Sequence, residues 1–231
     1  MKNTFFSSIA ALIIAVMISV PSAAFALTPQ ERITSSTNAV QEISNQEDVE
    51  TMAYLVKKSY GVVIIPNFYK AAIGVGGSYG EGLVLRHNPA TNRWYGPSFM
   101  NITGASYGLQ IGVQSTALLL VITNEAGMKH FYGDTVKLGA NVDVAAGPVG
   151  RSAGAATDVN LKASIYSYSI SKGLFAGLSL GGSVMGTDVE ANNSFWGSKY
   201  NSRTILKKRA TSNSVKPLLA ALNKLSLKST D

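Results

Sequence analysis

Bulky apolar residues alternate with glycine and serine along several segments of the sequence. Between 174 and 184 the even positions are mostly apolar, whereas the odd positions from 177 to 183 are glycine or serine. The same alternation recurs at 71–83, 104–113 and 138–147. In an extended chain it gives one face with bulky side chains and one bare face with mostly glycine, serine or asparagine. Period-two alternation predicts β-strands, and each glycine inside a strand costs roughly 0.5–1 kcal/mol relative to alanine. Repeated bare faces therefore indicate that other groups approach these strand backbones closely.

Three arrangements explain the bare faces: a helix packed on the sheet, tight curvature of the sheet, or an extended ligand such as an acyl chain. Packing and curvature are the more common causes, and the ligand groove stays open as an alternative. Residues 88–92, N-P-A-T-N, predict a turn. Apolar or alternating runs predict further strands at 62–65, 118–122, 163–170 and 174–185.

Helical signals lie mainly toward the two ends of the chain. Helices are predicted over 29–44 and from Asn45 to Lys58. Asn124 predicts the cap of a short helix, and Thr187 with Glu190 predicts a capping box for a helix that ends at Gly197. We therefore expect one α+β domain, in which a curved, mainly antiparallel, barrel-like sheet carries N-terminal and C-terminal helices.

The last predicted helix follows Ser214 and is amphipathic. Its basic residues lie away from an apolar stripe formed by Val215, Leu218, Leu219, Leu222 and Leu225. Such a stripe is typical of a terminal helix that docks on a sheet, and also of a basic helix that lies in a membrane surface. Periodicity leaves both interpretations open.

Residues 1–26 have the features of a cleaved signal peptide. Lys2 precedes an apolar run over 9–20, and Ala24 to Ala26 form an A-x-A cleavage pattern. The run is too short to span a bilayer comfortably. We therefore expect an exported, periplasmic or secreted protein that begins at Leu27, and a chain without cysteine has no disulfide to form there.

The positive charge of the chain is concentrated at its C-terminal end. Residues 27–198 contain eleven basic and twelve acidic residues, whereas 199–231 contain eight basic residues and Asp231 alone. We interpret 27–198 as the folded domain and 199–231 as a basic tail with the amphipathic helix. Such a tail predicts an anionic partner.

No motif predicts enzymatic chemistry. His87 and His130 lack metal-ligand partners at helical or strand spacing, so we expect both at the surface and no metal. The glycine-rich stretch 74–82 fits neither a dinucleotide fingerprint nor a phosphate loop, and the carboxylates are too scattered for an acid–base pair. We expect no enzyme and no cofactor, and we also exclude nucleic acid, because an exported protein rarely meets it and Lys207 to Arg209 lack an interleaved aromatic residue.

Four ordered blocks of the sequence resemble the SYLF domain family. They are G-V-V-I-I-P-N-F-Y-K-A at 61–71 with G-G-S-Y-G-E-G at 76–82, G-A-S-Y-G-L-Q-I-G-V-Q at 104–114, A-A-G-P-V-G-R-S-A at 145–153, and Y-S-Y-S-I-S-K-G-L-F-A-G-L-S-L-G-G at 166–182. The resemblance covers roughly residues 45 to 198. It implies a lipid-binding module without enzymatic activity, and the yeast members of the family also bind actin. Tyr60 stands where many relatives have lysine, and Lys57 and Lys58 lie just upstream as candidates for the same contact.

We therefore expect the protein to bind anionic phospholipid, phosphoinositide-like or other, at an envelope membrane surface. The alternative is a periplasmic protein-interaction or envelope-structural module whose basic tail binds an acidic partner. Arg151 and Lys172 are equally interpretable as structural partners of Asp143 or Asp188. The candidate lipid contacts are Lys57, Lys58, Lys70, Arg151, Lys172, Lys199, Arg203, Lys207, Lys208 and Arg209.

Overall fold

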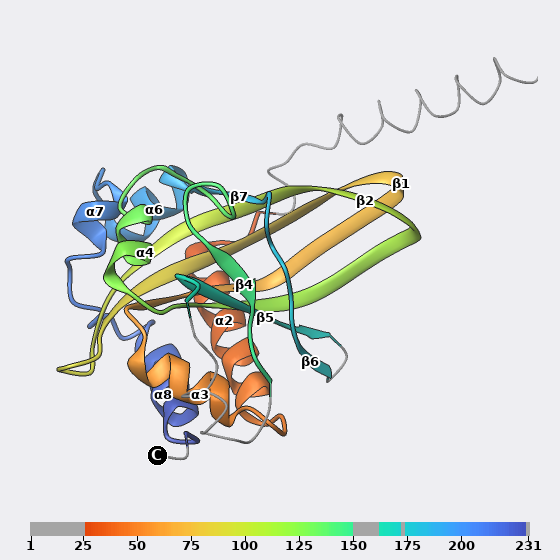
Figure 1. The fold of residues 1–231 in the computed structure, drawn as a ribbon. Coiled ribbons are helices and arrows are strands. Elements are labelled where there is room, and N and C mark those ends of the chain that lie inside the picture. The colour runs from red at the N-terminus through yellow and green to blue at the C-terminus, as the bar shows by residue number, and fades with distance from the viewer. Residues whose placement is uncertain (1–25, 150–161, 172–173, 230–231) are drawn as a thin grey trace, which may run out of the picture.

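Two very long strands, β1 (Gly61–Asn88) and β2 (Arg93–Ile122), form one antiparallel hairpin at the centre of the fold (Figure 1). The computed structural model describes residues 26–149, 162–171 and 174–229. The remaining elements are α2 (Pro29–Ser44), α3 (Glu50–Lys58), α4 (Glu125–His130), β3 (Thr135–Lys137), β4 (Val144–Ala146), β5 (Ile165–Ser171), β6 (Leu174–Gly177), β7 (Val184–Thr187), α6 (Val189–Trp196), α7 (Ser202–Ile205) and α8 (Lys216–Ser226).

The two ends of β2 pair with different strands. Strand β1 pairs with β2 along almost its whole length, while β7 pairs with residues 100–103 of β2 and β5 pairs with residues 117–122. Strand β3 flanks β7, and β6 and β4 pair with β5, with β4 running parallel to it. The result is a strongly curled half-barrel of mostly antiparallel strands with N-terminal and C-terminal helices. The predicted single α+β domain is confirmed.

Strand β1 bends back on itself, and two glycines permit the approach. A Cβ atom added at Gly82 would lie 2.0 Å from the carbonyl oxygen of Ile64, and one at Gly80 would lie 2.6 Å from Cγ2 of Ile65. The amide of His87 also donates to the carbonyl oxygen of Tyr60 at 2.9 Å. Curvature is therefore the cause of the bare face at this part of β1.

The apolar residues of the sheet form two cores, one on each face. Val62 and Ile64 belong to the core that α2, α3 and α8 cover, whereas Val63 and Ile65 belong to the core on the opposite face. Adjacent strand residues point to opposite faces. The β-branched run at 62–65 is therefore buried on both sides, as predicted for a buried strand.

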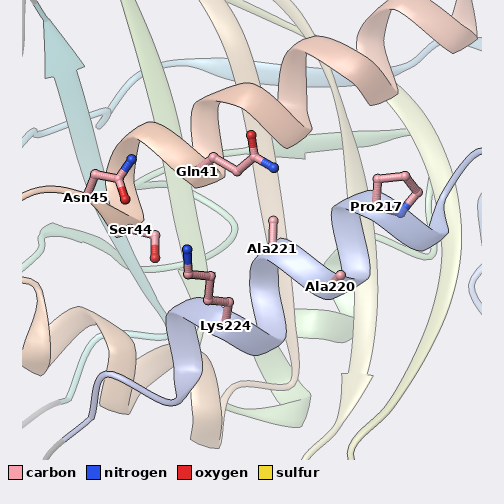
Figure 2. Close-up of a pocket in the computed structure, with 7 residues that line it drawn as sticks. All are labelled: Gln41, Ser44, Asn45, Pro217, Ala220, Ala221 and Lys224. Carbon is pink, nitrogen blue, oxygen red and sulfur yellow. The ribbon is translucent and has the colours of Figure 1, made fainter.

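Helix α8 docks on the body of the protein. Val215, Leu218, Leu222 and Leu225 are fully buried in the core that also contains residues of α2 and α3. Figure 2 shows α8 beside α2, and the residues labelled there line an open groove of about 430 Å³. Of the two interpretations of the apolar stripe, docking is the one that the structure shows, but α8 packs chiefly on helices α2 and α3 and not on the sheet as predicted.

Several predicted boundaries are wrong. The predicted strand at 174–185 is divided into β6 and β7 by a turn in which Gly182 has φ +85°, and the predicted strand at 138–147 begins only at Val144. The predicted strands at 71–83 and 104–113 are the middle parts of β1 and β2.

Three predicted helix caps are also wrong. Asp188, not Thr187, caps α6, because its carboxylate accepts from the amide of Ala191. Helix α3 begins at Glu50 after Val49, and α8 follows Val215 instead of Ser214. For α6 and α8 the residue next to the predicted cap has the flanking position, whereas for α3 the flanking residue Val49 lies four positions after Asn45, which instead ends α2.

Candidate functional site

The segment that follows α6 is folded against the turn end of the β1–β2 hairpin, which we call the hairpin base. The amide of Ala210 donates to the carbonyl oxygen of Trp94 at 3.0 Å, and the amide of Gly96 donates to the carbonyl oxygen of Lys208 at 2.9 Å. Asn201 caps α7 by accepting from the amide of Thr204 at 2.9 Å. These backbone contacts fix the position of a segment that is rich in basic residues.

Basic side chains of this segment lie over aromatic rings. The Lys208 ammonium is 4.2 Å from the centroid of the Tyr200 ring and 5.9 Å from that of Trp196. The Arg203 guanidinium is 5.9 Å from the Tyr132 ring. Cations within about 6 Å of an aromatic face are attracted by the ring quadrupole.

Arg86 and Arg209 share a fourth ring, that of Tyr95. Their guanidinium carbons lie 3.9 Å and 5.8 Å from the Tyr95 ring centroid, and Arg86 Nε donates to the carbonyl oxygen of Leu206 at 2.7 Å. We define the basic–aromatic face by the residues that make these ring contacts: Arg86, Tyr95, Tyr132, Trp196, Tyr200, Arg203, Lys208 and Arg209.

The charge of the face is not neutralised by carboxylates. Within the described part of the chain, no basic residue from Lys199 onward forms an ion pair. Arg203 and Arg209 are exposed, and Lys208 is half-buried. Because the rings contribute no net negative charge, the face presents positive charge to the solvent beside half-buried aromatic surface.

The structure brings together only part of the predicted site. Arg203, Lys208 and Arg209 belong to the basic–aromatic face, and Lys199 and Lys207 are exposed in the segments on either side of α7. Arg151 and Lys172 lie outside the described residues.

The three predicted lysines of the N-terminal half lie in two places. Lys57 and Lys58 are exposed at the end of α3, directly before Ser59, whose carbonyl oxygen lies 2.9 Å from Nδ1 of His87 at the hairpin base. Lys70 lies farther along β1, opposite Gln114, with its ammonium 5.5 Å from the Phe68 ring. It is therefore not part of the basic–aromatic face.

The predictions missed Arg86 and the four aromatic residues of the face. A signal for two of them was present, because a turn at 88–92 fixes the register of the hairpin. That register places Arg86 opposite Tyr95 and His87 opposite Trp94, and directly opposed side chains in an antiparallel pair interact. Tyr200 lies within the basic segment and Trp196 just before it, so their nearness to the cations was also visible in the sequence. Tyr132 approaches the segment only through the tertiary fold.

His87 is buried, so its predicted surface position is wrong. Its side chain is 3% exposed and stacks on the Trp94 ring with centroids 4.1 Å apart. Its Nε2 lies 3.0 Å from Oδ1 of Asn92. Burial lowers the pKa of His87, which favours the neutral imidazole in the folded state. The histidine is therefore a structural residue of the hairpin base, whereas His130 is exposed as predicted.

A buried charged cluster, also missed by the predictions, joins three elements. Arg32 of α2 is 2% exposed, and its Nη2 lies 2.7 Å from Oδ2 of Asp188 and 3.2 Å from Oε2 of Glu81. Asp188, an expected partner of Arg151 or Lys172, is thus paired with Arg32. Two carboxylates that are distant in the sequence therefore meet at one guanidinium.

The other features considered are the groove between α2 and α8, metal sites and membrane-spanning helices. The groove between α2 and α8 is lined by small and amide side chains, with Lys224 as its one charged residue (Figure 2). Among the described residues, no three histidine or carboxylate side chains are grouped so that they hold a metal ion. None of the helices in those same ranges has the length and hydropathy needed to cross a membrane.

Comparisons with known proteins agree on one family. Residues 103–225 match the family described as "Ysc84: Las17-binding protein actin regulator". The chain is 37% identical over 161 residues to Protein YSC84 of Saccharomyces cerevisiae, a match that covers 68% of this chain and 34% of the relative.

A vertebrate relative gives a similar result. The chain is 34% identical over 145 residues to SH3 domain-containing YSC84-like protein 1 of Xenopus laevis, which covers 62% of this chain and 43% of that protein. The chain thus spans about a third to two-fifths of the length of these relatives.

Proposed function

The chain belongs to the Ysc84 family, which is the SYLF family that the four sequence blocks indicated, and on this premise we propose that it binds anionic phospholipid at a membrane surface. The basic–aromatic face is the binding surface, and the activity is binding without enzymatic chemistry. The observation that carries the proposal is the set of cations that lie over aromatic rings and have no carboxylate partner.

The composition of the face suits a phospholipid headgroup layer. Each basic residue close to an anionic membrane surface contributes about 1 kcal/mol of attraction, which falls off within a Debye length. Tryptophan and tyrosine favour the interface between water and lipid, because each has an apolar ring and a polar group. Lysine and arginine beside such rings place positive charge at the depth of the phosphates.

The fold also reduces the entropic cost of binding. The backbone around Lys208 and Arg209 forms hydrogen bonds with the backbone of Trp94 and Gly96 in β2. Side chains on an ordered backbone lose less freedom on binding than those of a flexible tail. Lys57 and Lys58, exposed next to the hairpin base, extend the positive surface toward α3.

The proposed membrane lies on the exported side of the cell envelope. This part of the proposal rests on residues 1–26, whose composition is typical of a signal peptide. After export the protein would be peripheral to a membrane, on its periplasmic or outer side. The most abundant polyanion there is phospholipid.

A second candidate is binding of an acidic protein surface by the same face. The observation that favours it is the naming of the relatives, since the matched family is described as Las17-binding and one relative is called LAS seventeen-binding protein 3. A cationic and aromatic surface suits a protein interface as well, where tyrosine, tryptophan and arginine are the residues that contribute most.

Vesicle flotation tests the lipid proposal. The protein is mixed with vesicles of phosphatidylcholine alone or with added phosphatidylglycerol, at low and at high salt. We expect flotation with the anionic vesicles at low salt, and a large decrease at high salt, because salt screens exposed charges. Absence of flotation at low salt would overturn the lipid proposal and favour an acidic protein partner.

Matched charge variants locate the binding surface. Replacing Arg203, Lys208 and Arg209 with glutamine should weaken vesicle binding roughly 100-fold, at about 1 kcal/mol per residue. The control replaces Lys137, Lys216 and Lys224 with glutamine, which removes the same charge from exposed positions outside the face. Equal weakening by both variants would show that net charge alone, and not this face, determines binding. Substitution is needed because deletion of the C-terminal segment removes α8 from the core.

A further inference from the structure

The backbone of Leu27 is held on both sides by one charged cluster. Its amide nitrogen donates to Oε2 of Glu81 at 2.8 Å, and its carbonyl oxygen accepts from Nε of Arg32 at 3.0 Å. The next residue, Thr28, caps α2 in a reciprocal capping box with Glu31. The chain is therefore fixed from Leu27 onward, whereas Ala26 is exposed.

The cluster has more negative than positive charge. Arg32 is one cation facing the two carboxylates of Glu81 and Asp188, whose side chains are 8% and 15% exposed. Glu81 also accepts a hydrogen bond from the Tyr79 hydroxyl, and Asp188 accepts one from the amide of Ala191. Neither hydrogen bond brings a positive charge, so one more cation would balance the cluster.

We propose that hydrolysis of the Ala26–Leu27 peptide bond supplies that cation. A signal peptidase adds water across the bond, so the carboxylate leaves on Ala26 and the amine stays on Leu27. An α-amino group has a pKa of about 7.7–8.0 and binds a proton at neutral pH. The nitrogen that donates to Glu81 then becomes an ammonium, and the hydrogen bond becomes an ion pair.

The proposal assigns Glu81 a role as receptor for the new N-terminus and makes processing a stabilising event. In the precursor the same nitrogen belongs to a neutral amide, which donates one hydrogen bond without charge. Charge-assisted hydrogen bonds are roughly twice as strong as neutral ones. The inference is independent of lipid binding, since the cluster and the basic–aromatic face share no residue.

The pH dependence follows from the ion pair. Pairing with Glu81 raises the pKa of the Leu27 amine in the folded state, so the stabilisation is complete below the unfolded pKa of about 8. It is lost as pH rises through the folded pKa. The titratable and charged groups around the amine are Glu31 and Arg32 of α2, Tyr79 and Glu81 of β1, and Asp188 and Glu190 beside or in α6.

The test compares N-termini on the exported protein. Full-length protein is expressed, and intact mass and N-terminal sequencing should give a chain that starts at Leu27; a different start would overturn the proposal. The processed protein is then compared with an Nα-acetylated chain starting at Leu27, which keeps the N–H donor but has no charge.

We expect the equilibrium constant for unfolding at pH 7 to be at least 10-fold smaller for the free amine than for the acetylated chain. The two should converge near pH 10, and Glu81→Gln should remove the difference. If Glu81→Gln does not fold, the acetylated chain still decides, because it needs no substitution. Equal stability of the free and acetylated chains at pH 7 would overturn the proposal.

Discussion

At the scale of single residues, Arg32 joins segments that are far apart in the sequence. Its guanidinium contacts Leu27, Glu81 and Asp188, and Asp188 in turn caps α6. One buried cation thus aligns the N-terminal helix, the central hairpin and the helix that leads into the basic–aromatic face. The arrangement of these three elements depends on it.

Replacing Arg32 tests this dependence. Arg32→Met removes the guanidinium that pairs with both carboxylates in a poorly hydrated place, and loss of one partner of a buried pair costs about 3–5 kcal/mol. Urea unfolding measures the free energy of unfolding. The control is Lys129→Gln, which removes an exposed pair with Glu125 and should cost less than about 0.5 kcal/mol. Similar costs for both variants would contradict the structural role of Arg32.

His87 predicts a pH dependence of stability. Burial lowers its folded pKa, so below about pH 6.5 the unfolded chain binds a proton more readily than the folded one, and stability falls as pH falls. Thermal melts from pH 7.5 to 5 should show this decrease in the wild type and in His130→Gln, and a smaller decrease in His87→Phe. An unchanged pH slope in His87→Phe would be inconsistent with this explanation.

At the scale of elements, the sequence predicted which residues are extended but not how the strands continue. The alternation at 71–83 and the buried run at 62–65 are real, yet both lie in one 28-residue strand. Glycine indicates that a backbone is approached closely without indicating by what, and here the approaching group is an earlier part of the same strand. Such self-contact is determined by the tertiary fold.

Two glycine-to-alanine substitutions test whether the backbone of β1 is closely approached at Gly82, with Gly186 as the uncrowded control. Gly82→Ala places a methyl group against the carbonyl oxygen of Ile64 and should cost about 2 kcal/mol or more, as overpacking does. Gly186→Ala meets no atom within 4 Å and should change stability by less than about 0.5 kcal/mol. Denaturant midpoints measure both. A neutral Gly82→Ala would show that β1 does not bend as described.

A buried leucine in α8 and an exposed leucine just after it test whether the helix is part of the core. Leu222 is fully buried, whereas Leu227 is 83% exposed just after the helix. Leu222→Ala should cost about 2–5 kcal/mol, the usual range for a core leucine, and Leu227→Ala less than about 0.5 kcal/mol. Equal, small costs in denaturant unfolding would mean that α8 is not part of the core, and would restore the membrane-inserted alternative.

At the scale of the whole molecule, the sequence indicated the fold class, the family and a concentration of positive charge. It did not show that this charge is folded onto the hairpin base, because the contacts of Lys208 and Arg209 with β2 join residues more than a hundred positions apart. The contact of Arg203 with Tyr132 likewise joins residues that are distant in the sequence. Arg86 and Tyr95, linked by a predictable turn, were within reach of local reasoning, as were Trp196 and Tyr200, which lie beside Lys199 in the sequence.

The most direct test of the central claim is the fluorescence of Trp196 on vesicles. In Trp94→Phe, Trp196 is the remaining tryptophan of the two in the sequence, and it lies in the basic–aromatic face. With phosphatidylglycerol vesicles we predict a blue shift, protection from acrylamide, and quenching by lipids brominated near the headgroup. Phosphatidylcholine vesicles should change none of these. Unchanged Trp196 emission and quenching on protein that is bound to anionic vesicles would contradict the claim that this face contacts the membrane.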